Sequence, residues 1–372
     1  MPTALKGLKV LDFSTLLPGP FASMYLADMG AEVIHVESPS RPDLVRIMPP
    51  YANGQATAHS YLNRNKQSIT LDLKDAANIE LIKNKISEFD ILLEQFRPDV
   101  MRRLGLDYET LAEINPRLIY CSITGYGQTG TYKDRAGHDI NYLALAGVSG
   151  HSGRQDGGPP PLGIQIADVA GGSLHAVIGI LAAVVERQRS GMGQYIDISM
   201  TDCVASLNSM AASASLAGQT PQGPEQGMLN GAIFYDYYET KDGRYFSVGS
   251  LEPQFMTGLA AALDLPILMA KGSSFDPEDR QAIKQALKEK FSSKDFAEWQ
   301  SIFSQLDICV EPVLSLDEAL TSPIAKQRGW VVDVPLSENT DQTEPQLACP
   351  IKFSRSQMRY QFIGQGLGQG KW

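Results

Sequence analysis

A histidine and an aspartate stand side by side where a loop is expected to enter a helix. Gly137 precedes His138 and Asp139 directly. An imidazole next to a carboxylate can take up and release a proton near neutral pH, which is the chemistry of a general acid or base. Asp139 could equally cap the helix while His138 only packs against its neighbours, because aspartate is a favoured N-cap residue. These residues alone leave both interpretations open.

A second aspartate, Asp168, falls between an expected strand and a long apolar helix. It could be a plain N-cap whose charge the helix dipole stabilises. Its position favours a functional role, because ligands of open α/β sheets bind beyond the carboxyl ends of the strands and at helix N-termini. His138 is expected at the same edge.

Several cations follow expected strands. They are Arg41, Lys74, Arg97, Arg102 and Arg103. In an acidic protein, such cations at the ends of neighbouring parallel strands would form a local phosphate site, because guanidinium groups bind phosphate oxygens in pairs. The alternative is an ordinary solvated surface. Glu252, in an expected loop, carries little information by itself.

The elements that must position these residues are strands alternating with helices. Buried strands are expected at 8–13, 31–37, 68–73, 90–93 and 118–124, with helices at 21–29, 75–87 and 98–104. This alternation predicts a parallel α/β sheet. The first turn, Leu16–Pro20, lacks the G-x-G-x-x-G pattern, so dinucleotide binding of the usual kind is disfavoured.

The middle of the chain changes in character. A loop at 147–163 precedes the apolar helix, a second helix is expected at 202–216, and a polar linker follows at 218–227. Beyond the linker, a Tyr-rich hairpin (233–238 and 244–248) and amphipathic helices (277–291 and 293–303) predict a smaller α+β domain.

Composition limits the possible functions. The 372 residues contain 42 acids and 32 Lys plus Arg, for a net charge of −10, which disfavours nucleic acid and anionic membranes as partners. The longest apolar stretch, 176–185, is about half of what a membrane span needs. No secretory signal is visible, so a cytoplasmic location is expected. The four cysteines are widely spaced and expected to be reduced, and no metal-binding motif is present.

Five stretches together resemble the family III CoA-transferases, the CaiB/BaiF family, and within it the α-methylacyl-CoA racemases. They are 5–12, 18–20, 30–37, 65–74 and 96–99, and they occur in the family's order. The family's catalytic aspartate precedes a Gly-rich helix start, which Asp168 and Gly171–Gly172 match. The stretch Gly137–Tyr142 is similar to the racemase version.

The resemblance implies roles for individual residues. His138 and Asp168 would be the catalytic pair, with Asp139 and Glu252 as supporting acids. Arg41, Arg97 and Arg103 would bind the phosphates of coenzyme A, and Lys74 belongs to the same cluster of cations. No separate cofactor is implied, because CoA is carried as part of the thioester substrate.

The resemblance also implies an interlocked homodimer and a reaction. The large Rossmann-like domain would comprise 1–200 and 325–372, followed by a linker at 201–227 and a small domain at 228–324. The implied reaction is inversion of the α-carbon of a 2-methylacyl-CoA by His138 and Asp168 through an enolate. The alternative is transfer of CoA between carboxylic acids through an Asp168 anhydride and thioester. The C-terminus, with its repeated glycines from Gly364 to Gly370, departs from the family's usual ending.

Overall fold

The chain folds into two compact units. The computed structural model describes residues 2–274 and 276–372. The first unit comprises Met1–Ala146, Leu162–Asn208 and Pro323–Trp372, and the second comprises Gly147–Pro161 and Ser209–Ser322. The segment at 147–161, expected in the large domain, therefore belongs to the second unit. There the guanidinium of Arg154 donates to Asp236 Oδ1 at 2.7 Å and to Glu225 Oε1 at 2.9 Å.

A six-stranded parallel sheet forms the centre of the first unit. Its order is β5-β2-β1-β6-β7-β8. The strands are β1 (Lys9–Asp12), β2 (Glu32–Glu37), β5 (Lys66–Thr70), β6 (Ile91–Glu94), β7 (Ile119–Thr124) and β8 (Tyr195–Ser199). The chain order reverses between β1 and β6, which makes this pair the switch point where ligands of Rossmann-like sheets bind. The predicted parallel α/β sheet is confirmed.

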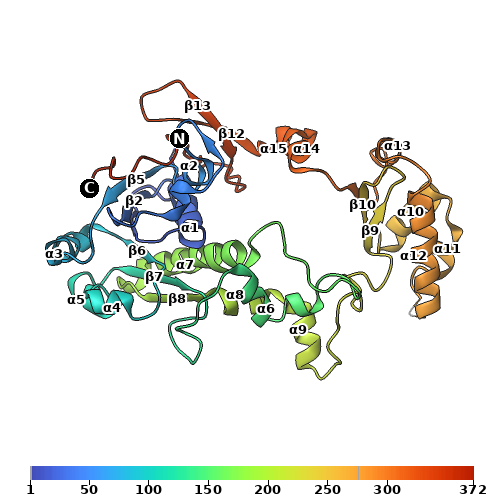
Figure 1. Ribbon diagram of the computed structural model, residues 1–372, viewed down its shortest axis with the longest axis horizontal. Coiled ribbons are helices and arrows are strands. Elements are labelled where there is room, and N and C mark those ends of the chain that lie inside the picture. The colour runs from blue at the N-terminus through green and yellow to red at the C-terminus, as the bar shows by residue number, and fades with distance from the viewer. Residues whose placement is uncertain (1, 275) are drawn as a thin grey trace. The chain divides into compact units, whose positions relative to one another are not determined.

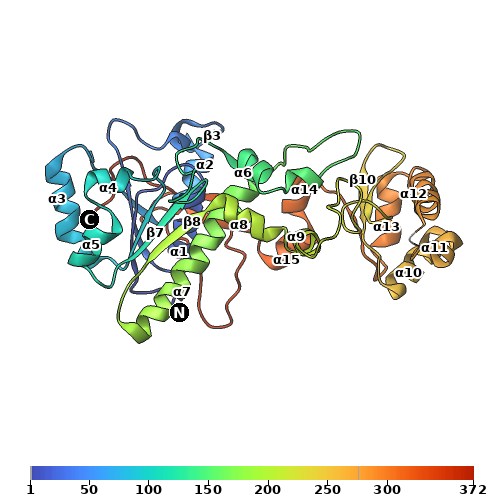
Figure 2. The same cartoon turned by 90° about the horizontal axis from the view of Figure 1, so that it is seen from below.

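Helices cover both faces of this sheet. One face packs on α3 (Ala76–Lys85), α4 (Val100–Leu104) and α5 (Tyr108–Ile114), whose apolar residues form one core cluster with Leu11, Leu92 and Tyr120. Figure 2 shows these three helices grouped at one side. Helix α1 (Pro18–Asp28) contacts β1, β2 and β6, and α7 (His175–Ser190) lies along β7 and β8 (Figure 1). Because both faces are covered, the central strands β6 and β7 are buried along their whole length, as central parallel strands usually are.

Short elements complete the first unit. They are η1 (Leu44–Ile47), β3 (Tyr51–Ala52), β4 (Gln55–Ala56), α2 (Thr57–Leu62), η2 (Ile86–Glu88), α6 (Asp139–Leu145), η4 (Ala167–Leu174), α8 (Met200–Leu207), α15 (Pro323–Arg328), β12 (Val331–Pro335) and β13 (Thr343–Leu347).

The prediction of a single helix at 202–216 is wrong. The chain forms α8 and α9 (Ser209–Leu216) instead, and Asn208 between them donates a side-chain hydrogen bond to the carbonyl of Ala146 at 2.8 Å.

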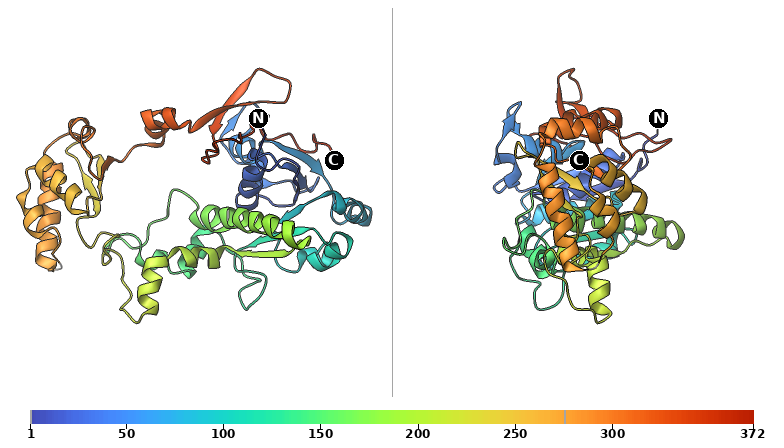
Figure 3. Two further views of the ribbon diagram at one scale, coloured as in Figure 1. Left: turned by 180° about the vertical axis from the view of Figure 1, so that it is seen from behind. Right: turned by 90° about the vertical axis from the view of Figure 1, so that its right-hand side faces the viewer.

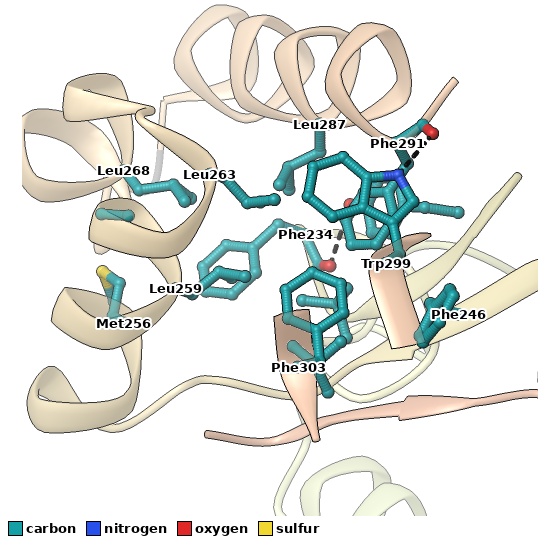
Figure 4. Close-up of a cluster of buried hydrophobic side chains, with 14 of the residues drawn as sticks. Phe234, Phe246, Met256, Leu259, Leu263, Leu268, Leu287, Phe291, Trp299 and Phe303 are labelled. Carbon is teal, nitrogen blue, oxygen red and sulfur yellow. Dashed lines mark hydrogen bonds between the residues drawn. The ribbon is translucent and has the colours of Figure 1, made fainter. Parts of the chain in front are cut away.

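The second unit has a core of its own. A three-stranded antiparallel sheet, in the order β11-β10-β9, packs against four helices. The elements are β9 (Asp236–Glu239), β10 (Tyr245–Val248), β11 (Val310–Pro312), α10 (Pro253–Leu263), α11 (Pro266–Lys271), α12 (Pro277–Phe291) and α13 (Phe296–Phe303); the unit also contains η3 (Ser149–His151) and α14 (Leu316–Thr321). Figure 4 shows Trp299 and Phe303 in the middle of this aromatic core, with the Trp299 indole donating to the Phe291 carbonyl at 2.8 Å.

The helix that starts at Ala167 runs without a break to Ser190. Over its 24 residues it is long and apolar enough to cross a membrane by length and composition, a test that core helices of globular proteins also pass. Here the helix contacts β7, β8 and α1.

The four cysteines are free, and the described parts of the chain contain no group of three or more acidic, His or Cys side chains that could hold a metal.

Candidate active site

Two cavities lie at the carboxyl edge of the parallel sheet. The first has a volume of about 780 Å³, and its walls come from the segments that follow β1, β2, β5 and β6. It is lined by Phe13, Thr15, Leu16, Val36–Ser38, Ser40–Leu44, Ile47, Leu71–Lys74, Phe96, Val100 and Leu104. Its size and largely apolar wall suit a small-molecule ligand.

The second cavity, of about 380 Å³, is lined by the segments that follow β6 and β7. His138, Arg97 and Tyr142 line it, and Phe96 lines both cavities. The cavities therefore lie on either side of the point where the strand order reverses. Both cavities also lie beyond the carboxyl ends of the strands, the edge at which the sequence predicts ligand binding.

The cations predicted to bind phosphate do not all lie at one cavity. Arg41 and Lys74 line the first cavity, and Arg97 lines the second. Arg103 lines neither, because it follows Asp99 by one turn of α4 and is exposed to solvent on that helix. The structure thus places three of the five predicted cations at the cavities, and leaves Arg102 and Arg103 exposed on α4.

His138 is held at the start of α6 by its neighbours. It is the N-cap residue, and its backbone N–H donates to Asn141 Oδ1 at 3.0 Å. The Tyr142 hydroxyl donates to the Gly137 carbonyl at 2.6 Å. A Cβ atom on Gly137 would lie 2.6 Å from the Tyr142 ring, so only glycine fits this position. The imidazole itself is exposed and lines the second cavity.

Asp139 does not cap its own helix. Its Oδ1 accepts the backbone N–H of Ala167 at 2.6 Å and of Asp168 at 3.0 Å, so it caps η4, the π-helical turn that begins at Ala167. A carboxylate at this end also meets the positive end of the helix dipole. Asp139 thereby ties the segment that carries His138 to the segment that carries Asp168.

Asp168 is the second residue of η4, and the N-cap of η4 is Ile166, so the plain capping interpretation of Asp168 is wrong. The side chain is half-buried. Burial, and then the charge of Asp139, raise the pKa of Asp168 from 3.8 to about 6, while His138 acts in the opposite direction. A carboxyl group with this pKa can exist in either protonation state near neutral pH, as an acid–base catalyst requires.

Close packing fixes η4 in place. The buried Ser173 hydroxyl donates to the Pro18 carbonyl at 2.7 Å and lies 3.1 Å from the Asp168 carbonyl. A Cβ atom on Gly171 would lie 2.9 Å from Val204. The two glycines after Asp168 therefore let this helix approach α1 and α8 closely, and short π-helical stretches are frequent at functional sites.

Glu252 lies in the second unit, exposed at the N-cap of α10. Its predicted part in the site stays a prediction. Ser173, whose hydroxyl joins η4 to Pro18, is not among the residues predicted from the sequence.

Residues 5–368 match CoA-transferase family III. The chain belongs to this family. Among curated relatives, it is 41% identical to the alpha-methylacyl-CoA racemase of Mus musculus over 330 residues, which are 87% of this chain and 81% of that protein. It is 33% identical to the succinyl-CoA:glutarate CoA-transferase of Homo sapiens over 336 residues, 89% of this chain and 76% of that protein.

A solved family structure gives the same fold. The CAIB/BAIF family protein from Brucella suis superposes with a TM-score of 0.86 at 31% identity, covering 99% of this chain and 97% of that one. Both racemases and CoA-transferases are thus among the similar family members, and the chemistry they share is that of an acyl-CoA thioester.

Proposed function

We propose that the protein is an α-methylacyl-CoA racemase. The observation that carries this proposal is an Asp168 whose pKa is raised to about 6 and that lies within electrostatic reach of His138. A racemase needs one group that removes the α-proton and another that returns a proton to the opposite face. The higher identity to the racemase, 41% against 33%, supports the same choice.

The predicted site residues would have separate roles in substrate binding and proton transfer. The first cavity would hold the CoA part of the substrate, with Arg41 and Lys74 near its phosphates. His138 would serve one face of the α-carbon and Asp168 the other. Either group takes the α-proton, the carbonyl carries the negative charge as an enolate, and the other group donates a proton to the opposite face.

The enolate oxygen needs hydrogen-bond donors. The first amides of η4 are already bonded to Asp139. At the start of α6, the amides of His138 and Asn141 are bonded to Asn141 Oδ1 and to the His138 carbonyl. The amides of Asp139 and Ile140 would therefore serve the enolate oxygen. In this scheme Asp139 positions Asp168 and tunes its pKa without touching the substrate.

The test is to incubate a 2-methylacyl-CoA of one configuration with the enzyme in D₂O, with no carboxylate acceptor. We expect one deuterium at the α-carbon and loss of optical purity, measured by mass spectrometry and chiral separation. His138→Ala and Asp168→Asn should each slow exchange by about 10²–10⁴-fold. Glu113→Gln, an exposed acid on α5 that lines neither cavity, is the control.

The transferase alternative predicts a different pattern. Asp168 would attack the thioester carbonyl, release CoA thiolate and form an anhydride, and His138 would have no necessary part. No deuterium uptake, together with CoA transfer to an added dicarboxylate that survives His138→Ala, would favour the transferase. The relatives that are CoA-transferases make this the second candidate.

We also propose that the protein acts as an interlocked homodimer. Support comes from apolar side chains that are exposed in the single chain, on α6 (Ile140 and Leu145), α7 (Ile178) and α8 (Leu207). Light scattering after size-exclusion chromatography should give twice the chain mass. The cytoplasmic location and the absence of a separate cofactor stay predictions.

A further inference from the structure

The C-terminal segment with its repeated glycines lies along the edge strand β5 (Figure 3). The Gly370 amide donates to the Ser68 carbonyl at 2.6 Å, and the Ser68 amide donates to Gln365 Oε1 at 3.1 Å. A Cβ atom on Gly370 would lie 2.5 Å from the Ser68 nitrogen. The glycines therefore allow a close backbone approach that covers the open edge of the sheet.

This segment also holds one arginine from the loop after β2. The guanidinium of Arg46 donates to the Gln365 carbonyl at 3.0 Å and to Ser68 Oγ at 3.1 Å. The Gly368 amide donates to the same Ser68 hydroxyl at 3.3 Å. Arg46 is thus held on one side by the C-terminal segment and by β5, the strand that this segment covers.

On its other side Arg46 binds Glu37, the last residue of β2. Arg46 Nε donates to Glu37 Oε1 at 2.8 Å, and Nη2 donates to Oε2, which makes the pair bidentate. Burial opposes ionisation of Glu37, but the hydrogen bonds and charge of Arg46 bring its pKa down to about 2. Glu37 is therefore a fixed anion at the end of the strand.

Glu37 in turn orders the wall of the first cavity. Its Oε1 accepts the Asp43 amide at 3.1 Å, and the Asp43 carboxylate accepts the amides of Leu16 and Val45, each at 3.0 Å. Between Glu37 and Arg46 lies the loop that carries Arg41 into the cavity. Arg46 itself is not among the residues that line the cavity, so it cannot act by touching the ligand there.

We propose that Arg46, held by the C-terminal segment 364–370, is a positioning residue that pre-orders this loop for the nucleotide part of CoA. The inference rests on the proposed function only in that CoA binds in the first cavity. A loop that is already ordered loses less entropy when the ligand binds. The C-terminal segment would therefore affect the affinity for CoA without changing the positions of His138 and Asp168.

The test measures CoA binding by calorimetry and deuterium exchange for two substrates, 2-methylacyl-CoA and the corresponding N-acetylcysteamine thioester, which lacks the nucleotide. Arg46→Gln should raise the Kd for CoA and the KM for the CoA ester about tenfold. The kcat for the CoA ester, and kcat/KM for the short thioester, should stay within about twofold of the wild type.

Two further variants keep the test decisive. Ser68→Ala removes the hydroxyl that both Arg46 and Gly368 contact, so it should also raise the Kd for CoA. This variant keeps the Arg46–Glu37 pair, so it can be measured even if Arg46→Gln does not fold. Gly370→Ala should push the tail from β5 and raise the Kd as well. Arg189→Gln, an exposed arginine in the last turn of α7 that lines neither cavity, is the control.

Unchanged CoA affinity in the folded Arg46, Ser68 and Gly370 variants would overturn the inference. Equal losses with the CoA ester and the short thioester would overturn it too, because they would show a general structural role. Failure of the proposed racemase activity appears separately, as the absence of exchange in the wild type, while the calorimetric comparison of variants still decides the role of Arg46.

Discussion

Asp139 Oδ1 lies 3.0 Å from the backbone nitrogen of Asp168 and accepts its N–H, although the two residues are 29 positions apart. The same oxygen accepts the amide of Ala167. One carboxylate therefore fixes the start of the helix that carries the candidate catalytic acid, and its charge raises the pKa of that acid.

The variant Asp139→Asn keeps an oxygen that can cap η4 but removes the charge. We expect the pKa of Asp168 to fall towards the ordinary carboxyl value, so the acidic limb of the pH–kcat profile should move to lower pH. Activity at neutral pH should fall about tenfold as the acid form of Asp168 becomes scarcer. The comparison with Asp139→Ala, which also loses the cap and about 1 kcal/mol of stability, separates charge from capping. An unmoved acidic limb in Asp139→Asn would contradict this account.

The raised pKa of Asp168 also predicts a cost in stability. Its folded pKa of about 6 lies above the value of 3.8 expected in the unfolded chain. Between these values the folded state binds more protons, so stability falls as the pH rises from about 4 to 6. The amide introduced by Asp168→Asn cannot ionise, so this variant does not lose stability over this pH range.

We therefore expect Asp168→Asn to be more stable than the wild type at pH 7.5 by about 1–2 kcal/mol, a figure already reduced because the side chain is partly exposed. The advantage should shrink as the pH falls from 6 towards 4. Urea unfolding at several pH values measures it. Equal stability at all pH values would mean that the carboxylate is not desolvated in the folded protein.

Ser173 should affect turnover more than substrate affinity. Its hydroxyl joins the helix of Asp168 to Pro18, and Ser173 itself lines neither cavity. Ser173→Ala should lower kcat about tenfold, because a small misplacement of a catalytic group is costly, and should leave KM nearly unchanged. Ser190→Ala, at the far, exposed end of the same helix, is the matched control. A rise in KM alone would contradict a positioning role.

Much of the first unit could be predicted from the sequence, because it depends on local patterns. An apolar run such as Ile91–Glu94 identifies a buried parallel strand. Arg41 and Lys74 could be placed at one edge because the carboxyl ends of parallel strands meet there. Arg103 could not, because one further turn of helix moves it away from the cavities.

Other features depend on contacts between distant parts of the chain. Asp139 looks like the cap of its own helix, and only tertiary structure shows that it caps η4 instead. Arg46 and Gln365 are 319 positions apart. No periodicity or short motif encodes such a contact, so the role of the C-terminal glycines could not be seen before the fold was known.

The packing of η4 gives a prediction about stability. A Cβ atom on Gly171 would lie 2.9 Å from Val204 and 3.2 Å from the Met200 carbonyl. Gly171→Ala should therefore cost about 1–3 kcal/mol of overpacking, although alanine favours a helix more than glycine does. Gly163→Ala, where nothing lies within 4 Å, is the control. Thermal unfolding of both variants measures the difference, and equal stability would show that η4 has room to move.

Arg97 and Arg103 provide a direct test of the site's extent. Both were expected to bind the phosphates of CoA, but only Arg97 lines a cavity. Removing a cation that binds phosphate loses a charge-assisted hydrogen bond, so Arg97→Gln should raise the KM for an acyl-CoA about tenfold at low salt, and less at high salt because ions screen the interaction. Arg103→Gln should leave the KM unchanged at both salt concentrations. An equal rise in the KM for both variants would mean that the CoA phosphates extend along α4, beyond the two cavities, whereas an unchanged KM for both would restrict phosphate binding to the first cavity.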